Sequence, residues 1–145
     1  MIRVVLDTNV LVSAAIRRLG PPGQAFDLVV YDERFRLVLS DLILAEARRV
    51  LGTARLARYF AGVPDPTAFV EEYIGRLDRL RIPVVVTSVV EVVADDPPDN
   101  HILACALDGR ARYLVTGNRR HFGALGEWRG IQIVDPAQFL AEVGR

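Results

Sequence analysis

The stretch that decides the class of fold is Ile2-Arg3-Val4-Val5-Leu6-Asp7-Thr8-Asn9, at the start of the chain. Its apolar first part is typical of a short buried strand, and Asp7 follows that strand directly. In open α/β sheets, ligands collect beyond the carboxyl ends of the parallel strands. An acid in this place, followed by two small polar residues, indicates a site built around a carboxylate.

Extended and helical patterns alternate along the rest of the chain. Further strands are predicted over 36–39, 82–86, 113–116 and 131–134. Helices are predicted over 9–16, 23–30, 41–51, 66–80, 99–108 and 136–143, with a further helical stretch over 54–61. Ser40, Asp65 and Asp135 have the residue type and position of helix N-caps. Strands separated by helices predict an α/β protein whose mainly parallel sheet is covered on both faces.

The size and composition suit one domain spanning residues 1–145. Its 145 residues are 51% apolar and 25% charged, which is enough for a hydrophobic core with a polar surface. Cys105 is the single cysteine, so no disulfide framework is expected. A strand that begins at Ile2 leaves no room for a signal peptide, and no apolar run is long enough to cross a membrane. We therefore expect a cytoplasmic protein with no membrane partner.

The charge pattern excludes some functions. The formal net charge is zero, which argues against a general binder of polyanions. All eighteen basic residues are Arg, for which genome composition is the simplest explanation, although Arg also suits bidentate contact with phosphate. Because the chain has no Lys, every mechanism that needs a Lys ammonium is excluded, including the phosphate-binding P-loop.

Two further acids lie where the helical pattern would place apolar residues. Glu46 is three residues after Ile43 and four before Val50, within the apolar stripe of its helix. Asp99 opens the apolar face of the helix over 99–108. Each has a simpler explanation: a Glu at the stripe edge that reaches solvent or pairs with an Arg, and an acid that stabilises a helix start. If they are buried, both carboxylates need a partner or a cation.

Polar residues near these positions extend the set. Asp95 and Asp96, just before the helix over 99–108, either add charge to the site or form a turn. Asn118, after the strand over 113–116, offers a carbonyl oxygen to a metal or holds a metal-bound water. His121 is interpreted first as a surface or packing residue, with phosphate contact or proton transfer as the alternative.

These acids are expected to meet at one edge of the sheet, because the turns that follow parallel strands share that edge. Asp7, Glu46 and Asp99 would then form the main ligand set, with Asn118 and Asp96 as additional ligands. Crowded carboxylates repel one another and raise one another's pKa values, and a hard divalent cation removes that cost. Oxygen ligands without Cys or paired His indicate Mg²⁺ or Mn²⁺ rather than Zn²⁺.

The order of these residues along the chain resembles a known family. The matching segments are Asp7-Thr8-Asn9, Ser40 with Glu46, Asp99 before Ile102-Leu103-Ala104, Val115-Thr116-Gly117-Asn118, and residues 130–136. Together they resemble the PIN-domain family, in particular the bacterial and archaeal branch of VapC-like toxins from toxin–antitoxin systems. The resemblance spans essentially the whole chain.

The resemblance implies a three-layer α/β/α sandwich with a parallel sheet in the strand order 3-2-1-4-5. It also implies Mg²⁺- or Mn²⁺-dependent hydrolysis of RNA phosphodiesters by Asp7, Glu46 and Asp99, a cognate antitoxin protein that covers the site, and a homodimer. The sequence departs from the family at two positions. Asn118 stands where the family has a fourth acid, and Pro98 stands where many members of this branch have an Asp.

The mechanistic hypothesis is that Asp7, Glu46 and Asp99 hold one or two cations that activate a water for in-line attack on the phosphodiester. The residues expected to orient carboxylates and waters are Thr8, Asn9, Ser40 and Thr116. The residues expected to steer the RNA backbone are Arg17, Arg18, Arg119 and Arg120. Four other arginines are expected to face solvent from their helices: Arg48, Arg49, Arg55 and Arg58.

Two other functions remain open. An aspartyl phosphotransferase or phosphatase would use Asp7 as a covalent nucleophile, but such enzymes have a second Asp two residues later and usually a Lys. Here that position is Asn9, and the chain has no Lys. A degenerate domain that binds RNA or a protein without cleaving it is favoured by Asn118 and Pro98. The retention of all three main acids argues against it.

Overall fold

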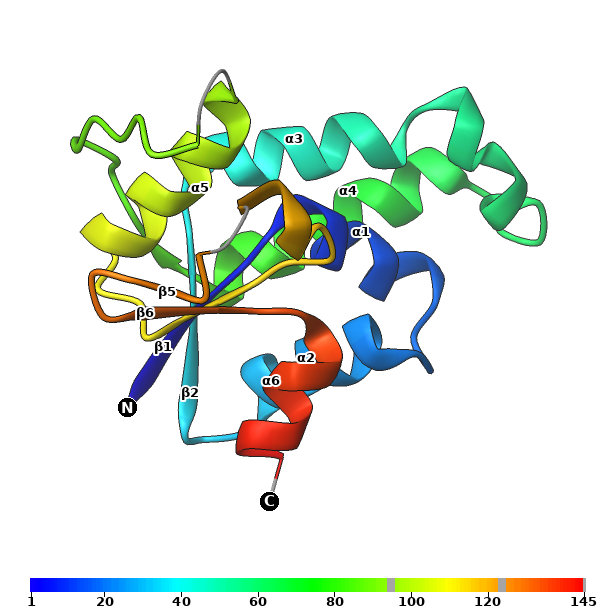
Figure 1. The fold of residues 1–145 in the computed structure, drawn as a ribbon. Coiled ribbons are helices and arrows are strands. Elements are labelled where there is room, and N and C mark those ends of the chain that lie inside the picture. The colour runs from blue at the N-terminus through cyan, green and yellow to red at the C-terminus, as the bar shows by residue number, and fades with distance from the viewer. Residues whose placement is uncertain (94–95, 123–124, 145) are drawn as a thin grey trace.

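The computed structural model describes residues 1–93, 96–122 and 125–144. The strands are β1 (Ile2–Leu6), β2 (Phe35–Leu39), β3 (Ile82–Pro83), β4 (Tyr113–Val115), β5 (Glu127–Trp128) and β6 (Ile131–Val134). The α-helices are α1 (Thr8–Ile16), α2 (Pro21–Tyr31), α3 (Asp41–Leu51), α4 (Pro66–Leu80), α5 (Pro97–Asp108) and α6 (Pro136–Val143). Two 3₁₀ helices, η1 (Ala54–Phe60) and η2 (Arg119–Phe122), complete the described elements (Figure 1).

The strands form one sheet in the order β3-β2-β1-β4-β6-β5. The first five strands in this order are parallel, and β6 is the strand predicted over 131–134. The predicted order 3-2-1-4-5 is therefore confirmed for the parallel strands. The structure adds β5, which pairs antiparallel with β6 at the edge of the sheet.

The hairpin of β5 and β6 was not predicted because its turn lacks the usual sequence signal. Arg129 and Gly130 form a two-residue connection, and both have positive φ angles, of 49° and 79°. Such a turn matches the twist of the strands but normally has Asn or Asp before the Gly. The strand itself has only two residues, Glu127 and Trp128, so it shows no alternating pattern.

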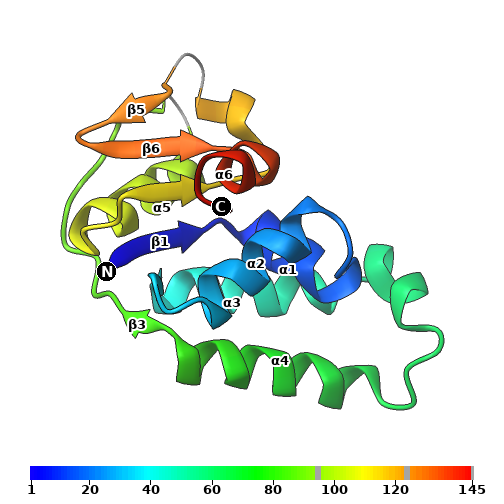
Figure 2. The ribbon, with the colours of Figure 1, turned by 90° about the horizontal axis from the view of Figure 1, so that it is seen from below.

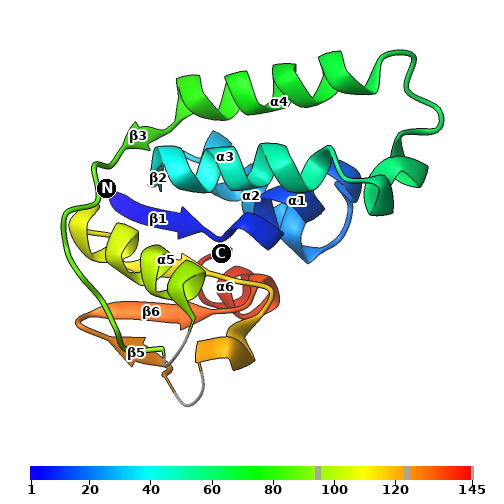
Figure 3. The same cartoon turned by 90° about the horizontal axis from the view of Figure 1, so that it is seen from above.

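The helices form a layer on each side of the sheet, which confirms the three-layer α/β/α fold. Helices α3 and α5 lie on one side, and α2 and α6 lie on the other (Figure 1). From below, α2 and α6 lie in front of the sheet, and from above α3 and α5 flank β1 (Figures 2 and 3). Helix α4 packs antiparallel against α3 beside the β3 edge (Figure 3).

The core consists of the strand side chains and the helix faces that cover them. On the α6 side, the ring of Phe139 packs edge-on against Phe35 and Tyr113, with centroids 5.7 and 5.3 Å apart. On the α5 side, Leu103 and Cys105 are fully buried. Burial on both faces explains why the strands have nearly continuous apolar sequences.

The predicted strand over 82–86 is wrong in its second half. Only Ile82 and Pro83 pair with β2, and the side chain of Val85 is 83% exposed. The chain beyond β3 is held by side chains instead. Asp108 accepts hydrogen bonds from the backbone N–H groups of Thr87 and Ser88, at 2.7 and 2.9 Å. The run Val84-Val85-Val86 has high strand propensity but does not extend the strand, because Pro83 already pairs with Leu39, the last residue of β2.

Helix boundaries agree with the predictions to within a few residues. Ser40, Asp65 and Asp135 are confirmed as N-caps of α3, α4 and α6. The helix predicted over 99–108 begins earlier, at Pro97, because Asp96 is its N-cap. The stretch predicted as helical over 54–61 is the 3₁₀ helix η1.

Within residues 1–93, 96–122 and 125–144, none of the helices combines the length and apolar character needed to cross a membrane. That residues 1–145 form one domain stays a prediction.

Candidate metal and catalytic site

The candidate site lies at the edge of the sheet where β1, β2, β4 and β6 end. The register pairs Leu6 with Val115 and Val115 with Val134, so these strands end side by side. The backbone N–H of Asp7 donates to the carbonyl of Val115, and that of Thr116 donates to the carbonyl of Val134. The parallel register therefore brings Asp7 and Thr116 together from positions far apart in the sequence.

Asp7 is buried and its carboxylate is held by two short hydrogen bonds. Oδ1 accepts from the backbone N–H of Thr8 at 2.7 Å, which caps α1, and Oδ2 accepts from the Thr116 hydroxyl at 2.8 Å. Burial raises the pKa of Asp7 above its ordinary value, and the hydrogen bonds from Thr116 and Thr8 only partly oppose that shift. A buried carboxylate that is fixed in place but costly to ionise is suited to a cation.

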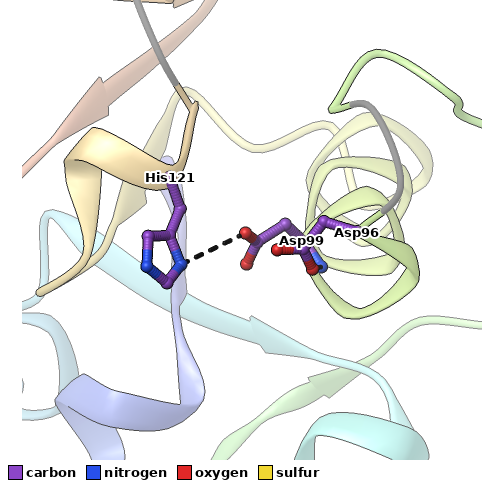
Figure 4. Close-up of side chains that lie close together, drawn as sticks. All are labelled: Asp96, Asp99 and His121. Atoms are coloured by element: carbon purple, nitrogen blue, oxygen red, sulfur yellow. Dashed lines mark hydrogen bonds and ion pairs between the residues drawn. The ribbon is translucent and has the colours of Figure 1, made fainter.

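Asp99 has a buried carboxylate oxygen that lacks a hydrogen bond within the described part of the chain. It lies in the first turn of α5, and its Oδ2 atom is buried without a hydrogen-bond partner among the described residues. Nδ1 of His121 lies 3.5 Å from this oxygen (Figure 4). Burial raises the pKa of Asp99 to about 6, and the neighbouring Asp96 and Asp7 add to that rise. In the absence of a cation, the structure therefore destabilises the ionised form of Asp99.

Asp96, Asp99 and His121 form a compact group of donor atoms. One ligand atom from each lies within 4.8 Å of the others, and they come from the start of α5 and from η2 (Figure 4). His121 had been interpreted first as a surface or packing residue. Its side chain is 46% exposed, but it faces Asp99. Asp95 lies outside the described residues.

A cleft of about 930 Å³ opens over this group. Its lining includes all three predicted catalytic acids, together with Asp96 and Asn118. Asp7 and Glu46 are not part of the compact group formed by Asp96, Asp99 and His121. The three main acids thus share one cleft, and their binding of the same cation stays a prediction.

Glu46 is not buried as its place in the helical pattern had suggested. Its side chain is 44% exposed, and its carboxylate pairs with Arg49 one turn further along α3. The hydrogen bond from Arg49 lowers the pKa of Glu46 below its ordinary value. Glu46 therefore lies at the edge of the apolar stripe, where α3 forms a wall of the cleft.

The four residues expected to orient the site fall into two groups. Thr8 and Thr116 bind the carboxylate of Asp7 directly, through the backbone N–H and the hydroxyl respectively. Asn9 and Ser40 act elsewhere. The Asn9 side chain accepts from the backbone N–H of Gly117 at 2.8 Å, which joins α1 to the end of β4. A side chain at position 117 would crowd the Asn9 amide, which explains the glycine there.

Ser40 contacts a histidine that the sequence had not singled out. Its hydroxyl lies 2.8 Å from Nε2 of His101 and accepts from the backbone N–H of Ile43. Ser40 is buried and does not line the cleft, whereas His101 does. Burial lowers the pKa of His101, which favours its neutral imidazole. The only sequence feature that could have pointed to His101 is its position two residues after Asp99, at the start of the same helix.

The arginines are distributed differently from the prediction. Of the four proposed to steer RNA, Arg17 lines the cleft and Arg18, Arg119 and Arg120 do not. Arg18 pairs with Asp27 at 2.8 Å, and the Nε of Arg119 donates to a backbone carbonyl of β6.

Two arginines expected only to face solvent also line the cleft. They are Arg55 and Arg58, both on η1, and both have exposed side chains. Their place in the cleft depends on the contact between η1 and the end of α1, where Arg17 donates to Tyr59, and no local sequence pattern predicts that contact.

An acid-lined cleft at the carboxyl edge of a parallel sheet defines the class: an α/β/α protein with a candidate site for a divalent metal. The family model of the PIN domain matches residues 3–120, a range that includes all three main acids and Asn118. The chain belongs to the PIN-domain family, whose members are generally metal-dependent nucleases. Among curated proteins, none matches this chain.

Proposed function

We propose that this protein is a metal-dependent endoribonuclease that hydrolyses RNA phosphodiesters in the cleft. The observation that carries the proposal is the Oδ2 atom of Asp99, which is buried beside other acids and accepts no hydrogen bond from the residues that the structure describes, with Nδ1 of His121 3.5 Å away. Such an atom costs folding free energy unless a cation binds it. A purely structural helix-start acid would not need to be buried this way, because Asp96 already caps α5.

The residues present fit a hard divalent cation. Asp99 and Asp96 would hold it, and His121 adds one nitrogen within the same group. Asp7 lies close enough to raise the pKa of Asp99, so its charge also favours a cation there. Carboxylate oxygens select Mg²⁺ or Mn²⁺, and the single imidazole fits Mn²⁺ as well. When bound, the metal would supply an activated water and polarise a phosphoryl oxygen.

The chain's own residues then have separate tasks. Thr116 and Thr8 fix the carboxylate of Asp7, so that its position does not depend on the ligand. Glu46 is ionised at neutral pH through its contact with Arg49 and offers hydrogen-bond acceptors to water on the opposite wall of the cleft. His121, which is exposed beside Asp99, is placed to donate to a phosphate oxygen or to the leaving oxygen.

We further propose that the protein is the toxin of a type II toxin–antitoxin pair. The support is the ordered set of residues that resembles the VapC-like branch, together with membership of the PIN-domain family. A cognate antitoxin would then cover the cleft, a homodimer would be the working form, and an RNA substrate would place the protein in the cytoplasm. Co-purification from cells that express the neighbouring open reading frame tests the antitoxin.

The alternative of a degenerate binding module is favoured by one observation, the exposed amide of Asn118 in place of an acid. It predicts RNA binding without cleavage.

The experiment compares cleavage of a labelled single-stranded RNA by metal-free protein after addition of Mn²⁺. Asp7→Asn is the test variant, and Asp27→Asn is the control because it makes the same change at an exposed acid that pairs with Arg18. We expect Asp7→Asn to lose roughly 100-fold or more in rate, as for a lost metal-site residue. Equal rates for wild type and Asp7→Asn would overturn the mechanism, and binding without cleavage would establish the alternative.

A further inference from the structure

Away from the acids, two arginines that line the cleft donate hydrogen bonds to the same tyrosine. Nη2 of Arg17 donates to the hydroxyl of Tyr59 at 2.8 Å, and Nη2 of Arg58 donates to the same oxygen at 3.0 Å. Both guanidinium groups also lie over the Tyr59 ring, 5.4 and 4.9 Å from its centroid. All three residues line the cleft, and Arg55 lines it beside them. Tyr59 thus holds two cationic groups close together on the cleft wall.

Arg17, Arg55 and Arg58 have no acidic partner among the described residues. Arg17 and Arg58 differ from other exposed arginines without such a partner, for example Arg36 and Arg79, because they share one tyrosine in the cleft. In residues 1–93, 96–122 and 125–144, no carboxylate lies within 4.0 Å of Arg17, Arg55 or Arg58. By contrast, Arg18 pairs with Asp27 and Arg48 pairs with Glu71. Two guanidinium groups that share one oxygen repel each other, and an anion between them relieves that repulsion. Planar guanidinium groups suit the paired oxygens of a phosphate.

The arginine end lies well away from the acidic end. Helix α1 has Asp7 as its N-cap and Arg17 as its C-cap, so the two residues are ten positions apart, or about 15 Å at the rise of an α-helix. The cleft lining contributed by α1 and α3 includes a group of apolar side chains, Val12, Ile16 and Val50, together with the polar Ser13 and Glu46. Such an apolar group suits unpaired bases, whose faces are free to pack against it.

We propose that Arg17 and Arg58, positioned by Tyr59, bind a backbone phosphate of single-stranded RNA remote from the scissile phosphodiester. The bases between the two phosphates pack against the apolar group. Duplex RNA is a poor fit, because its bases are stacked and paired and so cannot reach that group. This inference rests on the proposed function, since it names the substrate class for the same cleft.

The test measures binding of a fluorescein-labelled oligouridylate by anisotropy, in EDTA and across a range of salt concentrations. The test variant is Arg17→Gln/Arg58→Gln. The control is Arg18→Gln/Arg48→Gln, which removes the same charge from exposed ion pairs outside the cleft lining. Tyr59→Phe keeps the ring but removes the oxygen that holds both arginines. Thermal melts check that each variant folds.

Each neutralised phosphate contributes about 0.7 to the slope of log affinity against log salt for single strands, so the test variant, which loses one phosphate contact, should have a slope smaller by about 0.7. Its affinity should therefore fall about 2.6-fold less than that of wild type between about 50 and 200 mM salt. Tyr59→Phe should weaken binding without lowering the melting temperature. An unchanged slope, or an equal loss in the control, would overturn the inference.

Two further arms separate the alternatives. If labelled oligoglutamate binds in an arginine-dependent way and oligouridylate does not, the subsite serves an acidic protein partner and the RNA proposal is overturned. Cleavage is measured apart from binding. If the salt slope depends on the arginines but wild type does not cleave RNA, the phosphate subsite is supported and the ribonuclease is refuted. If wild type cleaves RNA but the salt slope of the test variant is unchanged, the ribonuclease is supported and the subsite is refuted.

Discussion

Replacing Asp99 by Asn should stabilise the metal-free protein and remove its response to metal. The substitution keeps the shape of the side chain but removes the charge that the structure isolates beside Asp96 and Asp7. In the unfolded chain the Asp99 carboxyl ionises near its ordinary value of 3.8, whereas in the folded protein its pKa is about 6. Between these values the unfolded state loses its proton first, so the free energy of unfolding falls as the pH rises.

The size of the effect follows from that shift. A rise of about two pKa units corresponds to roughly 3 kcal/mol, which is fully expressed above the folded pKa. The Asn amide has polar atoms of its own that lack partners there, so we expect a net gain of about 1–2 kcal/mol near pH 7. For a chain of this length that gain corresponds to a rise in melting temperature of about 2–8 °C.

Adding Mn²⁺ should reverse which protein is more stable, wild type or Asp99→Asn. At a free Mn²⁺ concentration about 100 times the Kd, binding stabilises the wild type by about 2.7 kcal/mol. Asp99→Asn lacks the central ligand and should gain almost nothing. Wild type should therefore be less stable than the variant in EDTA and more stable than it in Mn²⁺.

Thermal melts in EDTA and in Mn²⁺, repeated from pH 7 down to about pH 5, provide the assay. Asp27→Asn serves as the control because Asp27 is exposed and outside the cleft. The reasoning is refuted if Asp99→Asn is less stable than wild type in EDTA near neutral pH. It is also refuted if the advantage of the variant does not shrink as the pH falls toward 5, or if the variant keeps the Mn²⁺-dependent shift.

Three other predictions concern single side chains. Thr116→Val leaves Oδ2 of Asp7 without its donor and should cost about 1–3 kcal/mol in urea unfolding and about 10–100-fold in Mn²⁺ affinity by calorimetry; unchanged affinity would contradict the role of Thr116. Glu46→Gln breaks only an exposed pair with Arg49, so stability should change by less than about 1 kcal/mol while Mn²⁺-dependent cleavage is lost; full activity would exclude Glu46 from the mechanism. Burial raises the pKa of the Cys105 thiol to about 11, so a thiol-specific disulfide reagent near neutral pH should modify the folded protein far more slowly than the urea-unfolded chain; similar rates would contradict its burial.

The fold was largely predictable because its strands are buried on both faces. Apolar runs such as those of β1 and β2 have few alternatives once helices alternate with them, and parallel connections constrain the topology. The errors lie at the edges of the sheet. Strand β5 has two residues and an unusual turn, and β3 stops after two residues, so pairing partners rather than local propensity decided both.

The site was predictable where it depends on strand ends and helix starts. Asp7 follows a buried strand and Asp99 opens a helix, and both positions translate directly into places at one edge of the sheet. Glu46 had two interpretations, a buried carboxylate or a stripe-edge residue paired with an Arg, and the structure confirms the second, because the spacing alone does not separate the middle of a helical stripe from its edge. The ion pair with Arg49 balances the negative charge of Glu46.

The sequence patterns by themselves determined the α/β class and the acids at the strand ends and helix starts, because burial and helix capping act over neighbouring residues. The order of the parallel strands was implied only by the resemblance to the PIN-domain family. Only the tertiary structure decided which groups share a cleft. His121 meets Asp99 through the packing of η2 against α5, and Arg58 meets Arg17 on Tyr59 through the path of η1. These contacts join segments from separate connections, whose mutual positions depend on long-range packing that no local pattern encodes.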